Sequence, residues 1–355
     1  MNHLTHFRKI TILRFVLAGL VLLFSVPALF ADGIASRYPN DVGIENDPAV
    51  ILADGFESYT SPSQLTTLGP WDGAGRQANL RIATEPGNHF GGQKSLEMKL
   101  PISSSEVGNG ITKLISPKEP VLFVRAYTKF DPGYDAFGHT GLRIRGGNSQ
   151  APGVPPPRDG SGWFTFVLQN ANLNRGGVLP GYQEIYSYWP WQRTNYGDHW
   201  YSDGWVSPYS PVIGNKGDWL AYPAQYPDFV PIPNWQPVRG VWYCYEFMVK
   251  VNALGTRNGE VAYWINGQLK GRWPNLFIRG IDSLKIDFVS LNLHALRSDR
   301  INKKWYDNVV IARSYIGPIS PPNSMSMAAV ADFNSDGRPD YVLQNTSTRQ
   351  TAIWY

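Results

Sequence analysis

Two stretches decide the fold that this sequence predicts: WYCYEFMVKV at residues 242–251 and VAYWINGQL at residues 261–269. In the first, Tyr243, Tyr245 and Phe247 alternate with other residues, which is typical of a strand with one buried face. The second contains Asn266-Gly267, the strongest two-residue signal of a β-hairpin. Together the two stretches predict antiparallel strands joined by tight turns.

Similar strand patterns recur on both sides of this hairpin, at residues 122–130, 163–168, 284–293 and 305–313, and helical periodicity is almost absent. The chain of 355 residues contains 35 glycines and 28 prolines, which suit a β protein with many turns and long loops. We therefore expect an all-β fold, a two-sheet antiparallel jelly-roll sandwich.

The N-terminus has the pattern of a secretory signal peptide. Basic residues Arg8, Lys9 and Arg14 precede an apolar stretch at residues 15–30, and small residues follow Pro27. This stretch is shorter than the roughly 20 residues that span a bilayer. We expect residues 1–31 to be removed and the mature protein, a monomer without a membrane span, to be secreted or held at the cell surface.

Charge and composition exclude several classes of protein. The net charge of +4 comes mostly from the signal, since the rest of the chain has 29 basic and 28 acidic residues. A nucleic-acid-binding protein would show a basic stripe or domain. Aromatic residues make up 14% and charged residues only 17%, which excludes disorder for most of the chain. The single cysteine, Cys244, excludes an intrachain disulfide and a cysteine-based zinc site.

A stretch rich in proline and serine, residues 319–326, is expected to link the sandwich domain, residues 32–318, to a short tail, residues 327–355. Oxygen-bearing side chains alternate around Gly337 in this tail, as a hard cation such as Ca²⁺ requires. We expect a calcium site there, and an ordinary turn is the alternative. The expected ligands are Asp332, Asn334, Asp336 and Asp340.

The tail, MAAVADFNSDGRPDYVLQNTSTRQTAIWY, resembles the start of an FG-GAP or VCBS-type calcium-binding repeat. Only one copy is present, and one such unit cannot bury its faces alone. The resemblance leaves open whether the natural chain is longer.

Residues 182–226 are unusually aromatic, because thirteen of the 45 are tryptophan or tyrosine. No strand period organises them, so we expect long loops that lie across one sheet and form a binding surface. The alternative is that these rings pack on one another. The expected sugar-binding residues are Trp189, Trp191, Arg193, Trp200 and Trp205.

The paired carboxylates that most glycosidases require are missing, since Glu184 and Glu246 each stand alone in their strands. The residues that are present suit β-elimination from a polyuronate, which needs a neutralised carboxylate, a base and an acid. Tyrosine can act as base and acid when cationic neighbours lower its pKa. Tyr186 and Tyr188 share one strand face by the two-residue period. The candidates that would contact the carboxylate are His139, Arg143, Arg145, Gln169 and Asn170.

Residues 242–318 resemble the C-terminal half of bacterial alginate and glucuronan lyases, which are concanavalin-type jelly rolls. The matching motifs are Trp242-x-x-x-Glu246, Trp264-x-Asn266-Gly267 and Trp305-Tyr306-Asp307-Asn308. Upstream, Tyr186-Ser187-Tyr188 stands where those lyases have a catalytic Tyr-x-Tyr. The resemblance implies that Tyr188 is the base or acid and Tyr186 a supporting hydroxyl. For the carboxylate-neutralising pair we expect His139 with Arg143, with Gln169 as the alternative.

The sequence departs from this family at two positions. His139 replaces a lysine, and the strand at residues 163–169 lacks an arginine, with Phe166 or Leu168 in its place. A non-catalytic carbohydrate-binding or adhesion module therefore stays open, as does a structural cell-surface protein. The resemblance also implies Glu57 and Asp307 as ligands of a structural Ca²⁺ where the first and last strands pair; solvated or arginine-paired acids are the alternative.

Overall fold

The computed structural model describes residues 33–136, 138, 140–150, 152–171, 177–193, 195–204, 206–208, 230–320, 325–331, 340–345 and 351–354. The expected signal peptide lies outside these residues. Within them, no helix has the length and apolar character needed to cross a bilayer.

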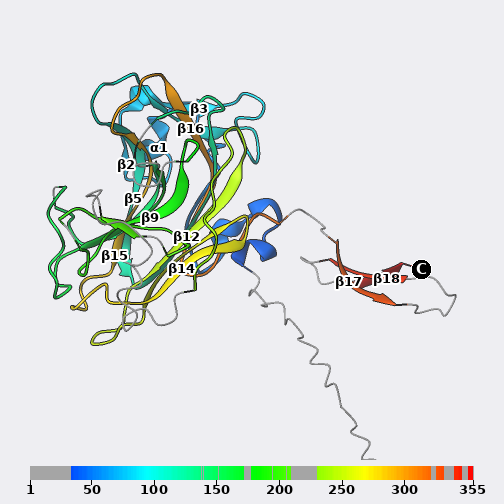
Figure 1. The fold of residues 1–355 in the computed structure, drawn as a ribbon. Helices are drawn as coiled ribbons and strands as arrows, with labels where there is room; N and C mark the ends of the chain where they lie inside the picture. The colour runs from blue at the N-terminus through cyan, green and yellow to red at the C-terminus, as the bar shows by residue number, and fades with distance from the viewer. Residues whose placement is uncertain are drawn as a thin grey trace, which may run out of the picture. The chain divides into compact units, whose positions relative to one another are not determined.

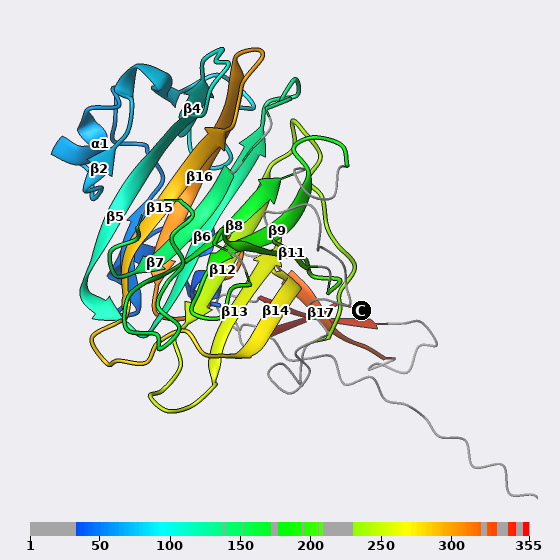
Figure 2. The same cartoon turned by 60° about the vertical axis from the view of Figure 1, so that its left-hand side comes forward.

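Two antiparallel sheets form the sandwich, as the sequence predicted (Figures 1 and 2). Among the described residues each sheet has eight strands. Sheet A has the order β14 (Gln268–Leu276), β13 (Gly259–Ile265), β12 (Tyr243–Lys250), β6 (Val121–Phe130), β16 (Asn302–Ala312), β4 (Ser95–Leu100) and β3 (Leu80–Ala83), with β1 (Val50–Asp54) paired to β16. Sheet B has the order β11 (Val206–Pro208), β10 (Asp198–Trp200), β9 (Tyr182–Tyr188), β8 (Phe164–Ala171), β7 (Thr140–Gly146), β15 (Ile286–Ala295), β5 (Val107–Glu119) and β2 (Gly73–Ala74).

Helical elements are short: α1 (Gln64–Thr67) and the 3₁₀ turns η1 (Ile34–Arg37), η2 (Pro39–Asp41), η3 (Ile44–Asn46) and η4 (Gln77–Asn79). The tail contains a separate three-stranded antiparallel sheet of β17 (Met325–Ala331), β18 (Asp340–Asn345) and β19 (Thr351–Trp354). Its identity as an FG-GAP or VCBS-type repeat stays a prediction.

The hairpin expected at Asn266-Gly267 is present. Strands β13 and β14 pair around the turn, and Asn266 and Gly267 both have positive φ angles, 50° and 77°. A type I′ turn requires positive φ at both central residues, which asparagine and glycine adopt at little cost. The first and last strands of the sandwich also pair, with Asp54 opposite Val309.

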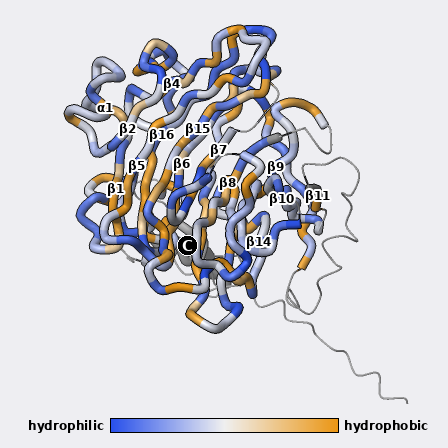
Figure 3. The backbone as a smooth tube through the Cα atoms, turned by 90° about the vertical axis from the view of Figure 1, so that its left-hand side faces the viewer, coloured by the Kyte–Doolittle hydropathy of each residue, from blue (hydrophilic) through white to orange (hydrophobic). Residues whose placement is uncertain are grey.

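The core consists of the alternate side chains that face the space between the sheets. From sheet A they include Phe247, Val249, Val261 and Tyr263, and from sheet B they include Leu142, Ile144, Leu168 and Ile185; all are at most 1% exposed. Figure 3 shows the resulting mixture of hydrophobic and hydrophilic positions along the strands. The pattern fixes which residues of sheet B lie on the face turned away from the core.

The aromatic stretch is more ordered than its sequence indicated. Three strands, β9, β10 and β11, lie within it and extend sheet B, so the expectation of loops alone is wrong for this part. Strands β10 and β11 are three residues long, which leaves too few positions for a two-residue period to be visible. Residues 209–229 lie outside the described part.

Lys304 on β16 is buried among aromatic rings, with its Nζ 4.5 Å from the Phe130 ring centroid and 4.7 Å from that of Tyr306. Burial lowers the pKa of Lys304 to about 7. Its pKa in an unfolded chain is about 10.4, so from pH 7 upward the unfolded state binds more protons and stability rises with pH.

We expect Lys304→Met to raise the free energy of unfolding at pH 7 by about 2 kcal/mol, because it removes the burial cost of the charge while the rings keep an apolar partner. Urea unfolding at several pH values between 6 and 9 measures this. The variant should lose most of the rise with pH, whereas Lys250→Met on the exposed end of β12 should keep it. An unchanged pH slope in Lys304→Met would contradict the expectation.

Candidate functional site

Tyrosines and arginines gather on the face of sheet B that is turned away from the core. The ladder places Arg143 opposite Val167 and Val167 opposite Tyr186, and the next row joins Arg145, Thr165 and Tyr188. Neighbouring residues Leu142, Leu168 and Ile185 are in the core, so these rows lie on the other face. The expected sharing of one face by Tyr186 and Tyr188 is confirmed, and the two arginines lie two strands away.

The two tyrosine hydroxyls are hydrogen-bonded to each other. Tyr186 Oη donates to Tyr188 Oη at 3.1 Å, and the Trp163 ring stacks on Tyr188 with centroids 5.2 Å apart. Burial, with a smaller contribution from Tyr188, raises the pKa of Tyr186 above its ordinary value. This is opposite to the lowering expected from the sequence. It follows that Tyr186 stays protonated and donates a hydrogen bond to Tyr188.

The two arginines have no carboxylate partner among the described residues. Arg143 Nε donates to Thr165 Oγ1 at 2.9 Å, and the Arg145 guanidinium carbon lies 4.1 Å from the Phe288 ring centroid. Burial, and then the neighbouring Arg145, lowers the pKa of Arg143 to about 10, so it stays cationic at neutral pH. Asp287, the acid whose charge counteracts the lowering of the Arg145 pKa by burial, is paired with Lys118 at 3.0 Å. Two positive charges are therefore available to an anionic ligand.

A buried polar cluster beside the tyrosines was missed by the sequence reasoning. Glu184 Oε1 accepts a hydrogen bond from Gln169 Nε2 at 2.7 Å and lies 2.7 Å from His199 Nδ1. The His199 ring lies 4.6 Å from that of Tyr186 between centroids. Burial alone raises the pKa of Glu184, but His199 and the hydrogen bonds to Tyr201 and Gln169 outweigh it and hold the pKa low.

The hydrogen bond to Glu184 holds the His199 ring beside Tyr186. The cluster also includes Gln169, which was predicted from the sequence to contact the substrate carboxylate. The two-residue period could have placed Glu184 on the face of Tyr186 and Tyr188. His199 could not have been found this way, because strand β10 gave no pattern.

Several residues that were predicted to contact the sugar do not lie on the sheet face that carries the tyrosines and arginines. Asn170 is on the opposite face from Gln169, where Nδ2 donates to Gly181 O at 3.3 Å. Trp189 and Trp200 are 4% and 0% exposed and belong to the core, so we do not assign them to a sugar-binding surface. Arg193 is paired with Asp198 at 3.5 Å. Trp191 is half-buried against the core.

His139 and Trp205 lie outside the described residues, as do Asp332, Asn334 and Asp336 of the expected calcium loop. Asp340 is the first residue of β18, and its side chain is not described.

Glu57 and Asp307 come together around one turn, residues 90–94. Glu57 Oε1 accepts the backbone N–H of Gln93 and of Lys94 at 2.9 Å, and Asp307 Oδ2 accepts that of Phe90 at 2.7 Å. Burial raises the pKa of Asp307 to about 7, and Glu57 adds to this. Within the described residues no group of three or more His, Cys, Asp or Glu side chains could hold a metal ion.

Side-chain oxygen atoms lie close to the two glycines of this turn, Gly91 and Gly92. A Cβ at Gly91 would lie 2.6 Å from Asn308 Oδ1, and one at Gly92 would lie 2.2 Å from Glu57 Oε1. Asn308 Oδ1 is buried and accepts no hydrogen bond in the described part of the chain. Two carboxylates and an unpaired amide oxygen are ligands that Ca²⁺ prefers.

No protein-family model and no curated protein matches the sequence. Solved structures do match in fold. A variant of the alginate lyase Aly36B in complex with an alginate trisaccharide has a TM-score of 0.53 and 17% identity, covering 75% of this chain and 98% of that one. A PL-14 alginate lyase from Aplysia kurodai has a TM-score of 0.51 and 13% identity, covering 74% and 99%. At these identities the similarity concerns the fold.

Proposed function

We propose that this chain is an exported polysaccharide lyase that cleaves a uronate-containing polysaccharide by β-elimination. One observation carries the proposal: Arg143 and Arg145 share a sheet face with the linked hydroxyls of Tyr186 and Tyr188. The arginines supply positive charge for a sugar carboxylate, and the tyrosines supply groups that transfer protons. The fold of the alginate lyases supports the same chemistry.

The reaction assigns each group a step. The guanidinium of Arg143 binds the sugar carboxylate and stabilises the negative charge that develops when the adjacent carbon loses its proton. Tyr188, as its phenolate, takes that proton, and its anionic form is stabilised by the hydrogen bond that Tyr186 donates. The electron pair forms the new C=C bond, the bond to the leaving oxygen breaks, and Tyr188 returns the proton to that oxygen. Protons and electrons balance without a further reactant.

Ultraviolet absorbance tests the proposal, because the unsaturated product absorbs there and the substrate does not. The protein is incubated with alginate, glucuronan and other polyuronates, and the absorbance is followed with time. A rise on at least one polymer is expected. A non-catalytic carbohydrate-binding module would bind without any rise; the burial of Tyr188, which is 7% exposed, favours that alternative.

We further propose that Ca²⁺ binds at Glu57, Asp307 and Asn308 and stiffens the junction of the first and last strands. The chemistry supplied by the ion is structural, because it would join the 90–94 turn to β16. The alternating oxygen residues of the tail, Asp332 to Asp340, are proposed as a second calcium site. An export signal at residues 1–31 completes the proposal.

Adding Ca²⁺ to the chelator-treated protein is expected to raise the free energy of unfolding by about 2–3 kcal/mol at about a hundredfold excess over its Kd. Thermal unfolding with Ca²⁺, with Mg²⁺ and with chelator measures the effect. Asp307→Asn should remove most of it, and Asp299→Asn, an exposed acid in the loop before β16, should not. Equal melting temperatures with Ca²⁺ and with chelator would contradict the site.

A further inference from the structure

A cavity of about 290 Å³ lies where loops from both sheets meet. It is lined by Arg158 from the loop before β8, Trp191 from the turn after β9, residues 255–257 from the loop between β12 and β13, and Phe277 after β14. Its volume is near the lower end of the range for small-molecule sites, about 300 Å³, and fits one sugar residue. None of the tyrosine or arginine residues proposed above for the reaction lines it.

The Arg257 guanidinium lies over an indole ring. Its central carbon lies 3.8 Å from the Trp191 ring centroid, and Trp191 packs against the core. Stacking of this kind leaves the N–H donors at the edges of the guanidinium plane free to bind a carboxylate with two parallel hydrogen bonds. Trp191 therefore positions the arginine, and one face of its own ring is covered.

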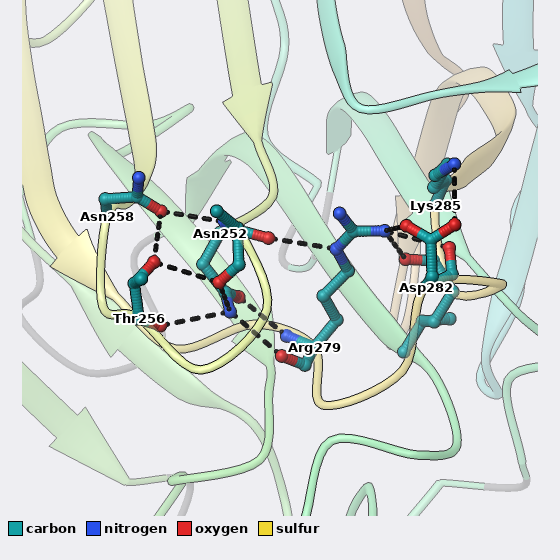
Figure 4. Close-up of polar contacts among 8 residues, drawn as sticks. Asn252, Thr256, Asn258, Arg279, Asp282 and Lys285 are labelled. Atoms are coloured by element: carbon teal, nitrogen blue, oxygen red, sulfur yellow. Dashed lines mark hydrogen bonds and ion pairs between the residues drawn. The ribbon is translucent and has the colours of Figure 1, made fainter.

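The loop that carries Arg257 is fixed by a network of hydrogen bonds around buried Asn252 (Figure 4). Asn252 Nδ2 donates to the backbone carbonyls of Ala253 and Thr256, and its Oδ1 accepts from the backbone N–H of Arg279 at 2.9 Å. Thr256 Oγ1 donates to Asn258 Oδ1 at 2.8 Å. A loop held in this way presents Arg257 without a large ordering cost on binding.

The cavity has two cations and no acid to neutralise them. Neither Arg158 nor Arg257 makes an ion pair with a described residue; Arg158 Nη2 donates to the Gln192 carbonyl at 3.4 Å. No Asp or Glu among the described residues lines the cavity. Of the neighbouring acids, Asp159 accepts a hydrogen bond from Ser161, and Asp282 pairs with Arg279 and Lys285. Two positive charges that line one cavity attract an anion.

From this arrangement we propose that the cavity is a binding subsite for one uronate residue, with Arg257 and Arg158 holding its carboxylate. The ligand class rests on the proposed function. Trp191 is three residues after Tyr188, so their Cα atoms are at most about 11 Å apart. The subsite lies close enough to Tyr188 for one polymer chain to reach both, and on this proposal it selects for a second acidic sugar.

Calorimetric titration with alginate and glucuronan tetrasaccharides, and with their carboxyl-reduced counterparts, tests the subsite directly. Tyr188→Phe serves as the background, because its expected loss of about 10³-fold in kcat keeps turnover slow during the titration. We expect Arg257→Met to weaken binding of at least one uronate tetrasaccharide about 10- to 100-fold and to leave the reduced sugars unaffected. Arg158→Met should have a smaller effect in the same direction. Arg76→Met, an exposed arginine near strand β2 at the opposite edge of sheet B, is the matched control.

The positioning role of Trp191 has its own readout. Trp191→Phe should keep most of the affinity because a ring remains under the guanidinium, and Trp191→Leu should lose it. Affinity in Arg257→Met equal to that of the control, or no uronate binding at all, would overturn the subsite. If the enzyme with Tyr188 intact turns over a polyuronate and Arg257→Met leaves its KM unchanged, the subsite is rejected and the lyase proposal stands. If binding depends on Arg257 but no turnover occurs, the subsite stands and the lyase proposal is rejected.

Discussion

Tyr188→Phe is expected to lower kcat on a polyuronate by about 10³-fold and to leave KM nearly unchanged. Proton transfer by a positioned side chain contributes about 10² to 10⁴ to a rate, and Tyr188 would perform both transfers. Phenylalanine keeps the ring that stacks on Trp163, so the loss is confined to the hydroxyl. Initial rates from ultraviolet absorbance, with the melting temperature of the variant, measure the effect.

Tyr186→Phe is the matched comparison. The Tyr186 hydroxyl donates to Tyr188 and, because burial raises its pKa, acts as a donor and not as a base. Its removal should lower kcat by about 10- to 100-fold, because one hydrogen bond to a charged group contributes about 1.5–3 kcal/mol. If Tyr186→Phe lost more activity than Tyr188→Phe, the roles of the two residues would have to be exchanged. If both variants kept full activity, the tyrosine pair would have no catalytic role.

Arg143→Met is expected to lower kcat/KM by about 10² to 10³, the usual loss when a preorganised donor to developing negative charge is removed. Methionine keeps the length of the stem beside the Phe288 ring, to which the guanidinium carbon lies 5.6 Å away. Arg143→Lys should recover only part of the activity, because an ammonium group cannot bind a carboxylate with two parallel hydrogen bonds.

Arg145→Met provides the control on the same strand, because it removes an equal charge one row further along the sheet. Arg145→Met should lower kcat/KM by about tenfold, mostly through a higher KM. Steady-state kinetics on the best polyuronate separate the two variants. A loss of less than threefold in Arg143→Met would show that another cation neutralises the carboxylate.

The sequence predicted the sandwich because its long strands alternate clearly. Strands β12, β13 and β14 with their Asn-Gly turn needed only the two-residue period and one turn signal. The pairing of the first strand with the last was expected only from the resemblance to concanavalin-type sandwiches. Strands β10 and β11 were not predicted, since each is only three residues long and their aromatic side chains indicated loops.

The candidate site was predicted in part for a related reason. Tyr186, Tyr188, Arg143 and Arg145 follow from alternation within single strands. The contact of His199 with Glu184 depends on the register between β9 and β10, which a single sequence does not contain. Trp189 and Trp200 were misassigned because an indole ring suits a core as well as a sugar, and only burial separates the two uses.

The most direct test of the account is the mass of the products from a polyuronate digested to short oligomers. β-Elimination leaves a C=C bond in one new end and consumes no water, so the account predicts oligomers lighter by one water than their hydrolysis products, with no oxygen incorporated from isotopically labelled water. Saturated products carrying the label would contradict elimination. Bound but uncleaved polyuronate would show a carbohydrate-binding module in place of an enzyme.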